Sequence, residues 1–330
     1  MSAVSSNGRA AVTIIGKTPP PIGGVTIHVS RLLRRLAEEG VPFIHFDPAK
    51  DRWSTLFSAV LRGRAIHVHV SNSYLRVFLV LLSAVLRRKS LITLHGNLGR
   101  YGATRNGFDN AAVWLADRPI LLNSASLSAA LALNPNSELV PAFIPPSSDL
   151  DASGEVGRLI ADWKGGRAPL FCSNAHARVS DKDGADIYCV ESLLEVFSGL
   201  PDAGLVFSDP SGTYSEYFDR SGTVVPQNVL MISEPHSFLE VLSSCDCMIR
   251  ATTTDGDSIS VKEALYLGVN VIASDCVPRP PGCLIYPTSD SESLARIVKE
   301  FERSEVSYLV EDAVPLLINA YRSLGVGLAQ

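Results

Sequence analysis

Short apolar runs alternate with longer segments of helical periodicity along almost the whole chain. Parallel strands need a crossover connection, which is usually a helix, so this alternation predicts βαβ units built on parallel sheets. In the first half, the predicted helices cover 26–39, 74–87 and 125–133. The predicted strands there are 12–15, 43–46, 65–70, 91–94, 119–123 and 139–143.

A second series follows Pro146, with helices predicted over 190–197, 238–243 and 260–267 and strands over 170–173, 204–208, 229–232, 247–250 and 269–273. A chain of 330 residues exceeds the usual size of one core, so two domains are predicted, 1–150 and 151–330. Their boundary is placed between about 142 and 167. The tail, 304–324, has helical periodicity and is predicted to close the second domain or return to the first.

Hydrophobic residues make up 46% of the chain and charged residues 19%, the balance of a soluble globular protein. No apolar stretch reaches the roughly 18 to 20 residues of a membrane-spanning helix, and the start, MSAVSSNGRAAV, lacks the pattern of a secretory signal. The six cysteines stand mostly in apolar runs and are interpreted as reduced core residues of a cytoplasmic protein. Because Cys245-Asp-Cys247 has no second ligand pair, no metal is expected.

Charge is distributed unevenly between the two halves. Residues 1–150 carry 16 Lys and Arg against 8 Asp and Glu, a net of +8, and the remainder carries 29−16=13 against 34−8=26, a net of −13. The basic half suggests an anionic partner such as phosphates, nucleic acid or a membrane surface, and solubility alone is the alternative. The apolar segment 74–89, which ends in Arg87-Arg88-Lys89, fits either a helix packed on a sheet or one docked on a membrane.

A glycine pair joins the first predicted strand to the first predicted helix, in Pro21-Ile-Gly23-Gly24-Val25. The first amides of a helix have no intrahelical partner, and glycine lets a phosphate approach them closely. The dinucleotide fingerprint GxGxxG and the P-loop Lys-Ser/Thr are both absent. From these residues alone, a simple turn and a phosphate contact both stay open.

The segment 250–275 leaves a predicted strand, crosses a loop rich in hydroxyl and carboxylate groups, and enters a helix near residue 259. Asp255 lies in the loop and Glu263 about one turn into the helix, so acceptors for a polyhydroxylated ligand stand at two depths. The alternative is structural, because Ser260 and Glu263 have the spacing of a capping box. Capping leaves Asp255 and Asp257 unexplained, since carboxylates are costly to bury unpaired.

These segments carry a family resemblance. The run from Asp255-Gly256 to Glu263-Ala264-Leu265 and on to Ser274 resembles the signature of retaining glycosyltransferases of family 4, two glutamates separated by seven residues, with aspartate in the first position. The glycine loop is similar to the family's, and Ile66-His-Val-His69 and Ile92-Thr-Leu-His95 resemble its two strand-ending histidine segments. The resemblance implies the GT-B fold, two Rossmann-like domains with parallel sheets facing across a cleft.

The resemblance also implies roles for the matching residues. The second domain would bind a nucleotide diphosphate sugar, Glu263 holding the ribose and Asp255 the sugar, while the first domain would bind the acceptor, with His95 lining the reaction centre. No protein nucleophile, cofactor or catalytic metal is implied, and transfer would depend on stabilisation of the departing diphosphate. The remaining donor-binding residues predicted are Gly23, Gly24, Gly256, Ser258 and Ser260.

The chain departs from the family where phosphate-binding Arg and Lys usually stand, after the first strand of the second domain. Arg178 and Lys182 are the predicted substitutes, with a merely solvated loop as the alternative. His67 and His69 are interpreted as core histidines of a buried strand, since two histidines without a third ligand are poor evidence for zinc.

We therefore predict a retaining glycosyltransferase that moves a sugar to a carbohydrate or lipid-linked acceptor during assembly of a surface polysaccharide. It is expected to be cytoplasmic, or peripheral at the inner membrane face through its basic first domain, with no nucleic acid as partner. The alternative is a non-catalytic nucleotide-sugar-binding or scaffold subunit. A nicotinamide-dependent oxidoreductase is disfavoured by the missing dinucleotide fingerprint.

Overall fold

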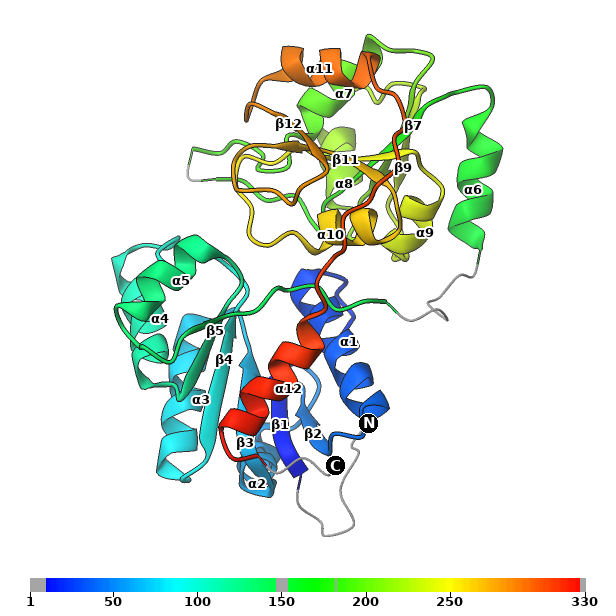
Figure 1. Ribbon diagram of the computed structural model, residues 1–330. Coiled ribbons are helices and arrows are strands. Elements are labelled where there is room, and N and C mark those ends of the chain that lie inside the picture. Colours follow the sequence, from blue (N-terminus) through cyan, green and yellow to red (C-terminus); the bar gives the residue numbers. More distant parts are fainter. Residues whose placement is uncertain (1–9, 147–153, 182, 327–330) are drawn as a thin grey trace. The chain divides into compact units, whose positions relative to one another are not determined.

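The computed structural model describes residues 10–146, 154–181 and 183–326 (Figure 1). The chain forms two compact units: unit 1 runs to Ile144 and resumes at Glu311, and unit 2 is Pro145–Val310. Each unit carries a six-stranded sheet whose neighbouring strands all run parallel. The predicted α/β class, with two Rossmann-like units, is confirmed.

Unit 1 has the strand order β2-β1-β3-β4-β5-β6. Its strands are β1 (Ala10–Gly16), β2 (Phe43–Phe46), β3 (Gly63–His69), β4 (Lys89–Leu94), β5 (Arg118–Leu121) and β6 (Glu138–Leu139). Its helices are α1 (Gly24–Glu38), the short 3-10 turn η1 (Trp53–Thr55), α2 (Leu56–Arg62), α3 (Ser73–Val85), α4 (Ala103–Leu115), α5 (Ser124–Leu131) and α12 (Ala313–Ser323).

Helices cover both faces of this sheet, which explains why its strands are mostly apolar. Successive side chains of a strand point to opposite faces. Ile14 accordingly packs in one cluster with residues of α1 and α12, whereas Ile15 packs in another with residues of α2, α3 and α4. In Figure 1, α12 lies beside α1 on the unit 1 sheet.

The C-terminal segment returns to unit 1, one of the two positions predicted for it. The backbone amide of Ala313 donates to the carbonyl of Phe143 over 2.9 Å. Near the other end of α12, the buried Tyr321 hydroxyl lies 2.7 Å from Nδ1 of His67 on β3. Unit 1 is therefore assembled from two separate stretches of the chain.

Unit 2 has the strand order β12-β11-β10-β7-β8-β9. Residues from α7, α8 and α11 share one core cluster with its sheet, and α9 and α10 contact its central strands. The strands are β7 (Leu170–Asn174), β8 (Gly204–Ser208), β9 (Val229–Ile232), β10 (Cys247–Arg250), β11 (Asn270–Ser274) and β12 (Cys283–Tyr286). The helices are α6 (Glu155–Lys164), α7 (Val190–Ser198), α8 (Thr213–Ser221), α9 (Phe238–Ser243), α10 (Ile259–Tyr266) and α11 (Ser291–Lys299).

Each sheet has one point where its strand order reverses, and parallel sheets bind ligands at the carboxyl ends of the strands beside that point. In unit 1 the reversal lies between β1 and β3, whose last residues, Gly16 and His69, are register partners. In unit 2 it lies between β7 and β10, which end at Asn174 and Arg250. None of the helices described is long and apolar enough to cross a membrane.

Candidate functional site

Three charged side chains form a buried cluster at the reversal point of unit 2. Arg250 ends β10 and binds Asp255 through two hydrogen bonds, Nε to Oδ2 and Nη2 to Oδ1, each 2.9 Å long. Arg279 donates from Nη1 to the same carboxylate over 2.8 Å. The three side chains are between 3% and 10% exposed. Two guanidinium groups share one carboxylate, so this cluster carries one formal positive charge.

The two arginines differ in how fully their N–H groups are used. Arg279 also donates from Nε to the carbonyl of Ser274 over 2.9 Å, and its Nη2 lies near Thr252, Ser274 and Cys276. Among the residues described, Nη1 of Arg250 makes two long hydrogen bonds, both of 3.4 Å to Asn174, and its guanidinium lies 5.3 Å from the centre of the Tyr188 ring. Arg279 therefore holds Asp255 in place, and Arg250 is better suited to donate to an anionic ligand.

The cluster keeps Asp255 ionised. Burial by itself would raise the pKa of Asp255, but hydrogen bonds and charge from Arg250 and then Arg279 lower the pKa to about 2. Oδ1 also accepts from the backbone amide of Gly256 over 3.0 Å. Its carboxylate thus binds and orients the two arginines, and a sugar contact at Asp255, which the sequence predicts, would have to share these oxygens.

The loop leads directly into the N-terminus of α10. The N-cap residue is Ser258, whose side chain makes no capping hydrogen bond and lies 3.2 Å from the hydroxyl of Ser260. Lys262 pairs with Asp257 over 2.6 Å. Glu263 is the fifth residue of the helix and is buried. A capping box would need Ser260 at the N-cap, so the capping-box alternative for Ser260 and Glu263 is wrong.

Arg178 lies in the loop after β7 and contacts α8. Its guanidinium is 3.8 Å from the centre of the Tyr217 ring, and its backbone amide donates to Thr213. Both α8 residues and Arg178 line an open pocket of about 500 Å³. The contacts of Arg178 thus join it to α8 rather than to α10. Lys182 lies outside the described residues.

The glycine pair of unit 1 stands at the N-terminus of α1. Gly23 is the N-cap with φ −170°, an extended conformation that any residue adopts, and neither glycine has a positive φ. The hydroxyl of Thr26 accepts from the Gly23 amide over 3.1 Å and donates to the carbonyl of Pro21 over 2.7 Å, which fixes the turn. The backbone conformation therefore does not require glycine at either position.

Four histidines gather at the reversal point of unit 1. His67 is a core residue, with Nδ1 bonded to Tyr321 and Nε2 lying 2.7 Å from the hydroxyl of Thr93. His69 ends β3, His95 directly follows β4, and Nδ1 of His69 lies 3.0 Å from Nε2 of His95. The ring of His28, on α1, lies 4.9 Å from that of His95. Burial, and then the neighbouring rings, lower the pKa of His69 and His95 well below its usual value.

Sequence reasoning missed three of these residues. The sequence predicts Arg250 at the end of a strand, but it does not predict the ion pair of Arg250 with Asp255. Arg279 stands 24 residues from its partner Asp255, so no local pattern indicates the contact. His28 lies inside a helical segment, where nothing in the sequence marks it as a neighbour of the two strand-ending histidines.

No protein-family model matches the sequence, and a search of curated proteins finds no match. Solved structures are similar to it in fold. HepE (Alr3699) of Anabaena, in complex with UDP-glucose, is 12% identical with a TM-score of 0.67, over 95% of this chain and 98% of that one. An alpha,alpha-trehalose-phosphate synthase (UDP-forming) from Burkholderia xenovorans, in complex with glucose-6-phosphate, is 12% identical with a TM-score of 0.67, over 96% and 100%.

Sucrose-phosphate synthase from Thermosynechococcus elongatus is 17% identical with a TM-score of 0.61, over 96% of this chain and 94% of that one. At these identities the similarity establishes the fold. The chain has the GT-B fold of these proteins, with a parallel-sheet, Rossmann-like unit in each half.

Proposed function

We propose that the protein is a glycosyltransferase that uses a nucleotide diphosphate sugar as donor. The observation that carries the proposal is the buried cluster of Arg250, Asp255 and Arg279 beside the N-terminus of α10, at the reversal point of the unit 2 sheet. A cationic cluster next to uncapped helix amides is suited to a diphosphate. Support also comes from the fold, since the similar HepE structure contains UDP-glucose.

In this proposal the donor is held by three parts of unit 2. Arg250 and the amides at Ser258 to Ser260 bind the diphosphate, because both present N–H donors and positive charge. The buried Glu263 accepts hydrogen bonds from the ribose hydroxyls. Asp255 positions Arg250 and is the family's candidate for contact with the sugar. We propose a hexose as the donor sugar, as the resemblance to family 4 implies.

The transfer step depends on stabilising the leaving group. As the bond between the sugar and the diphosphate breaks, negative charge grows on the phosphate oxygens, and preorganised N–H groups of Arg250 and α10 lower the barrier. We propose retention of configuration, with the departing phosphate oxygen taking the proton of the acceptor hydroxyl. This step uses no protein nucleophile and no metal ion.

Unit 1 is proposed to bind the acceptor. Gly23 and Gly24, at the N-terminus of α1, stay proposed contacts of the donor diphosphate, because glycine has no Cβ to keep a phosphate from the backbone. His95 follows β4 at the carboxyl edge, where ligands of parallel sheets bind, and its neutral ring can contact sugar hydroxyls. The proposed acceptor is a carbohydrate or lipid-linked sugar of surface polysaccharide assembly, with His95 as its contact in unit 1.

A membrane surface is the proposed location of that acceptor. Four large apolar side chains at helical spacing on α3 are exposed, and Arg87, Arg88 and Lys89 follow its C-cap residue Leu86, with Lys89 paired to Asp117. An apolar stripe beside basic residues fits an anionic lipid surface, which both groups of side chains would bind. The exposed residues are Tyr74, Phe78, Leu81 and Val85.

The experiment is a turnover assay with purified protein and a panel of nucleotide diphosphate sugars, in which release of the nucleoside diphosphate is measured with and without carbohydrate acceptors. The proposal predicts release with at least one donor, and its loss in Glu263→Gln and Arg250→Gln. Glu195→Gln, at an exposed position on α7, is the matched control and keeps full activity. Binding of a donor without release by the wild type would support the non-catalytic binding subunit instead.

A further inference from the structure

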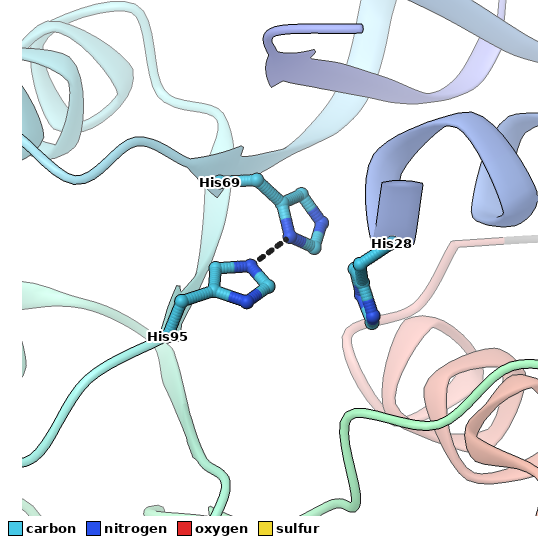
Figure 2. A group of neighbouring side chains, drawn as sticks. All are labelled: His28, His69 and His95. Atoms are coloured by element: carbon cyan, nitrogen blue, oxygen red, sulfur yellow. Dashed lines mark hydrogen bonds between the residues drawn. The ribbon is translucent and has the colours of Figure 1, made fainter. Parts of the chain in front are cut away.

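Three histidines from separate elements of unit 1 surround a common point. His28 comes from α1, His69 from the end of β3 and His95 from the residue after β4, and Figure 2 shows their rings gathered together. One nitrogen from each ring can be chosen so that the three atoms lie within 4.8 Å of one another. No other group of three such ligand residues with this spacing occurs among the residues described.

The spacing of the rings is that of a tetrahedral metal site. Zn²⁺ held at about 2.0–2.1 Å by three imidazole nitrogens places the ring centres roughly 5 Å apart. The observed separations of the ring centres are 5.2 Å for His28 and His69, 4.9 Å for His28 and His95, and 5.3 Å for His69 and His95. The triangle is nearly equilateral, as a shared central ion requires.

The hydrogen bond of His28 also suits a metal ligand. Its Nδ1 lies 2.7 Å from the carbonyl oxygen of Ala142, and a carbonyl only accepts, so Nδ1 carries the proton. In the neutral ring, Nε2 then carries the lone pair. A backbone carbonyl that orients a histidine in this way is the usual outer contact of zinc-binding imidazoles.

The other two rings already face each other through one nitrogen each. Nδ1 of His69 lies 3.0 Å from Nε2 of His95, and in the neutral rings one of these two nitrogens carries a proton. When that proton is released, both nitrogens can donate a lone pair to one ion. A cation at the centre would replace the hydrogen bond between the rings with two coordinate bonds.

We propose that His28, His69 and His95 bind one divalent transition-metal ion, with Zn²⁺ as the best fit. Three neutral imidazoles match its preference for nitrogen ligands, and no carboxylate is needed. His28 and His69 are buried, whereas His95 is partly exposed, so the ion enters and keeps its fourth position, for water or another ligand, on the side of His95. The zinc titration below does not depend on sugar transfer, although His95 is also the residue proposed to contact the acceptor, which a bound ion would then approach through its fourth position.

The test is a titration of chelator-treated, full-length protein with ZnCl2 in competition with a chromophoric chelator. One equivalent of Zn²⁺ is expected to bind tightly to the wild type. His28→Gln, His69→Gln and His95→Gln should each weaken binding about 100-fold or more, since even outer contacts of such sites are worth 10–100-fold. His45→Gln is the matched control, because His45 lies on β2 of the same unit, is bonded to the carbonyl of Gly16, and is outside the cluster.

Co²⁺ provides a readout on the unmutated protein, in case a variant does not fold. Bound by three imidazoles in a tetrahedral site, Co²⁺ gives strong visible d–d bands and no sulfur-to-cobalt charge-transfer band in the near ultraviolet. A charge-transfer band would assign the metal to the free cysteines of unit 2 and overturn the proposal. The absence of stoichiometric binding to the wild type, or binding to all three histidine variants as tight as to the wild type, would overturn it as well.

Discussion

Arg250 and Asp255 form a bidentate ion pair in which the two hydrogen bonds have the same length, 2.9 Å. The pair joins the end of β10 to the loop that leads into α10, so the strand fixes the start of the helix. Because Arg279 also binds this carboxylate, Arg250 keeps donor capacity and positive charge for a ligand. The stability of unit 2 and its proposed donor binding therefore depend on the same three side chains.

Asp255→Asn is predicted to destabilise unit 2 by about 3–5 kcal/mol near pH 7, because two buried guanidinium groups lose their counter-ion. The pKa of Asp255 is about 2 in the folded protein, against 3.8 for an ordinary aspartate. The stabilisation from its charge is thus complete above pH 4 and is lost as the pH falls through 2.

Urea unfolding at pH 6, 4 and 2.5 measures this effect. The difference in free energy of unfolding between wild type and Asp255→Asn should narrow at the lowest pH, where wild-type Asp255 begins to take up a proton. A difference that stays constant over this range would show that the ion pair does not set the stability of unit 2.

Tyr321→Phe is predicted to lower the free energy of unfolding of unit 1 by about 1–3 kcal/mol, because it leaves Nδ1 of the buried His67 without its partner. Tyr74→Phe is the control, since the Tyr74 side chain is 49% exposed. Urea unfolding of both variants measures the two effects. Equal stability of Tyr321→Phe and wild type would contradict the structural role given to the returning C-terminal helix.

Gly24→Val is predicted to reduce sugar transfer at least tenfold while changing the free energy of unfolding by less than about 1 kcal/mol, because the backbone at Gly24 does not need glycine. Gly16→Ala, by contrast, should lower the free energy of unfolding by about 1–3 kcal/mol. Its Cβ would lie 2.9 Å from Val29 and 3.0 Å from His69. Turnover assays and urea unfolding of both variants distinguish a ligand contact from a simple turn. If Gly24→Val loses turnover and stability to the same degree, the glycine pair is a simple turn.

Full-length protein is predicted to sediment with phosphatidylglycerol vesicles and much less with phosphatidylcholine vesicles. Phe78→Glu and Val85→Glu place a carboxylate on the exposed stripe of α3 and should release the protein. Val224→Glu alters a side chain that is 84% exposed in unit 2 and should have no effect. If the two α3 variants bind vesicles as well as the wild type, the exposed stripe of α3 does not contact the lipid surface.

Most of the fold was predictable because buried parallel strands are short apolar runs between helical segments. β8, β9 and β10 have the predicted bounds, and α9 does also. β12 was missed: it is a short edge strand after a proline-rich loop, and the side chains of Leu284 and Ile285 are 46% and 47% exposed. The sequence does not show which unit the tail packs on, because its apolar face is compatible with either.

The candidate site was predictable only where its residues are close in sequence. The loop from Asp255 to the start of α10 follows from local pattern, but the ion pairs of Asp255 with Arg250 and Arg279 depend on packing. Likewise, the burial of His67 and His69 was predictable from their strand alone. His28, which completes the cluster with His69 and His95, lies on a helix that tertiary contacts place over the ends of β3 and β4.

The most direct measurement is a thermal-shift panel of nucleotide diphosphate sugars on wild type, Arg250→Gln and Glu263→Gln. A ligand at 100 times its dissociation constant stabilises a protein by about 2.7 kcal/mol, enough to raise the melting temperature measurably. The account predicts that at least one donor raises the melting temperature of the wild type and of neither variant. No shift with any donor, or equal shifts in all three proteins, would contradict donor binding at β10 and α10.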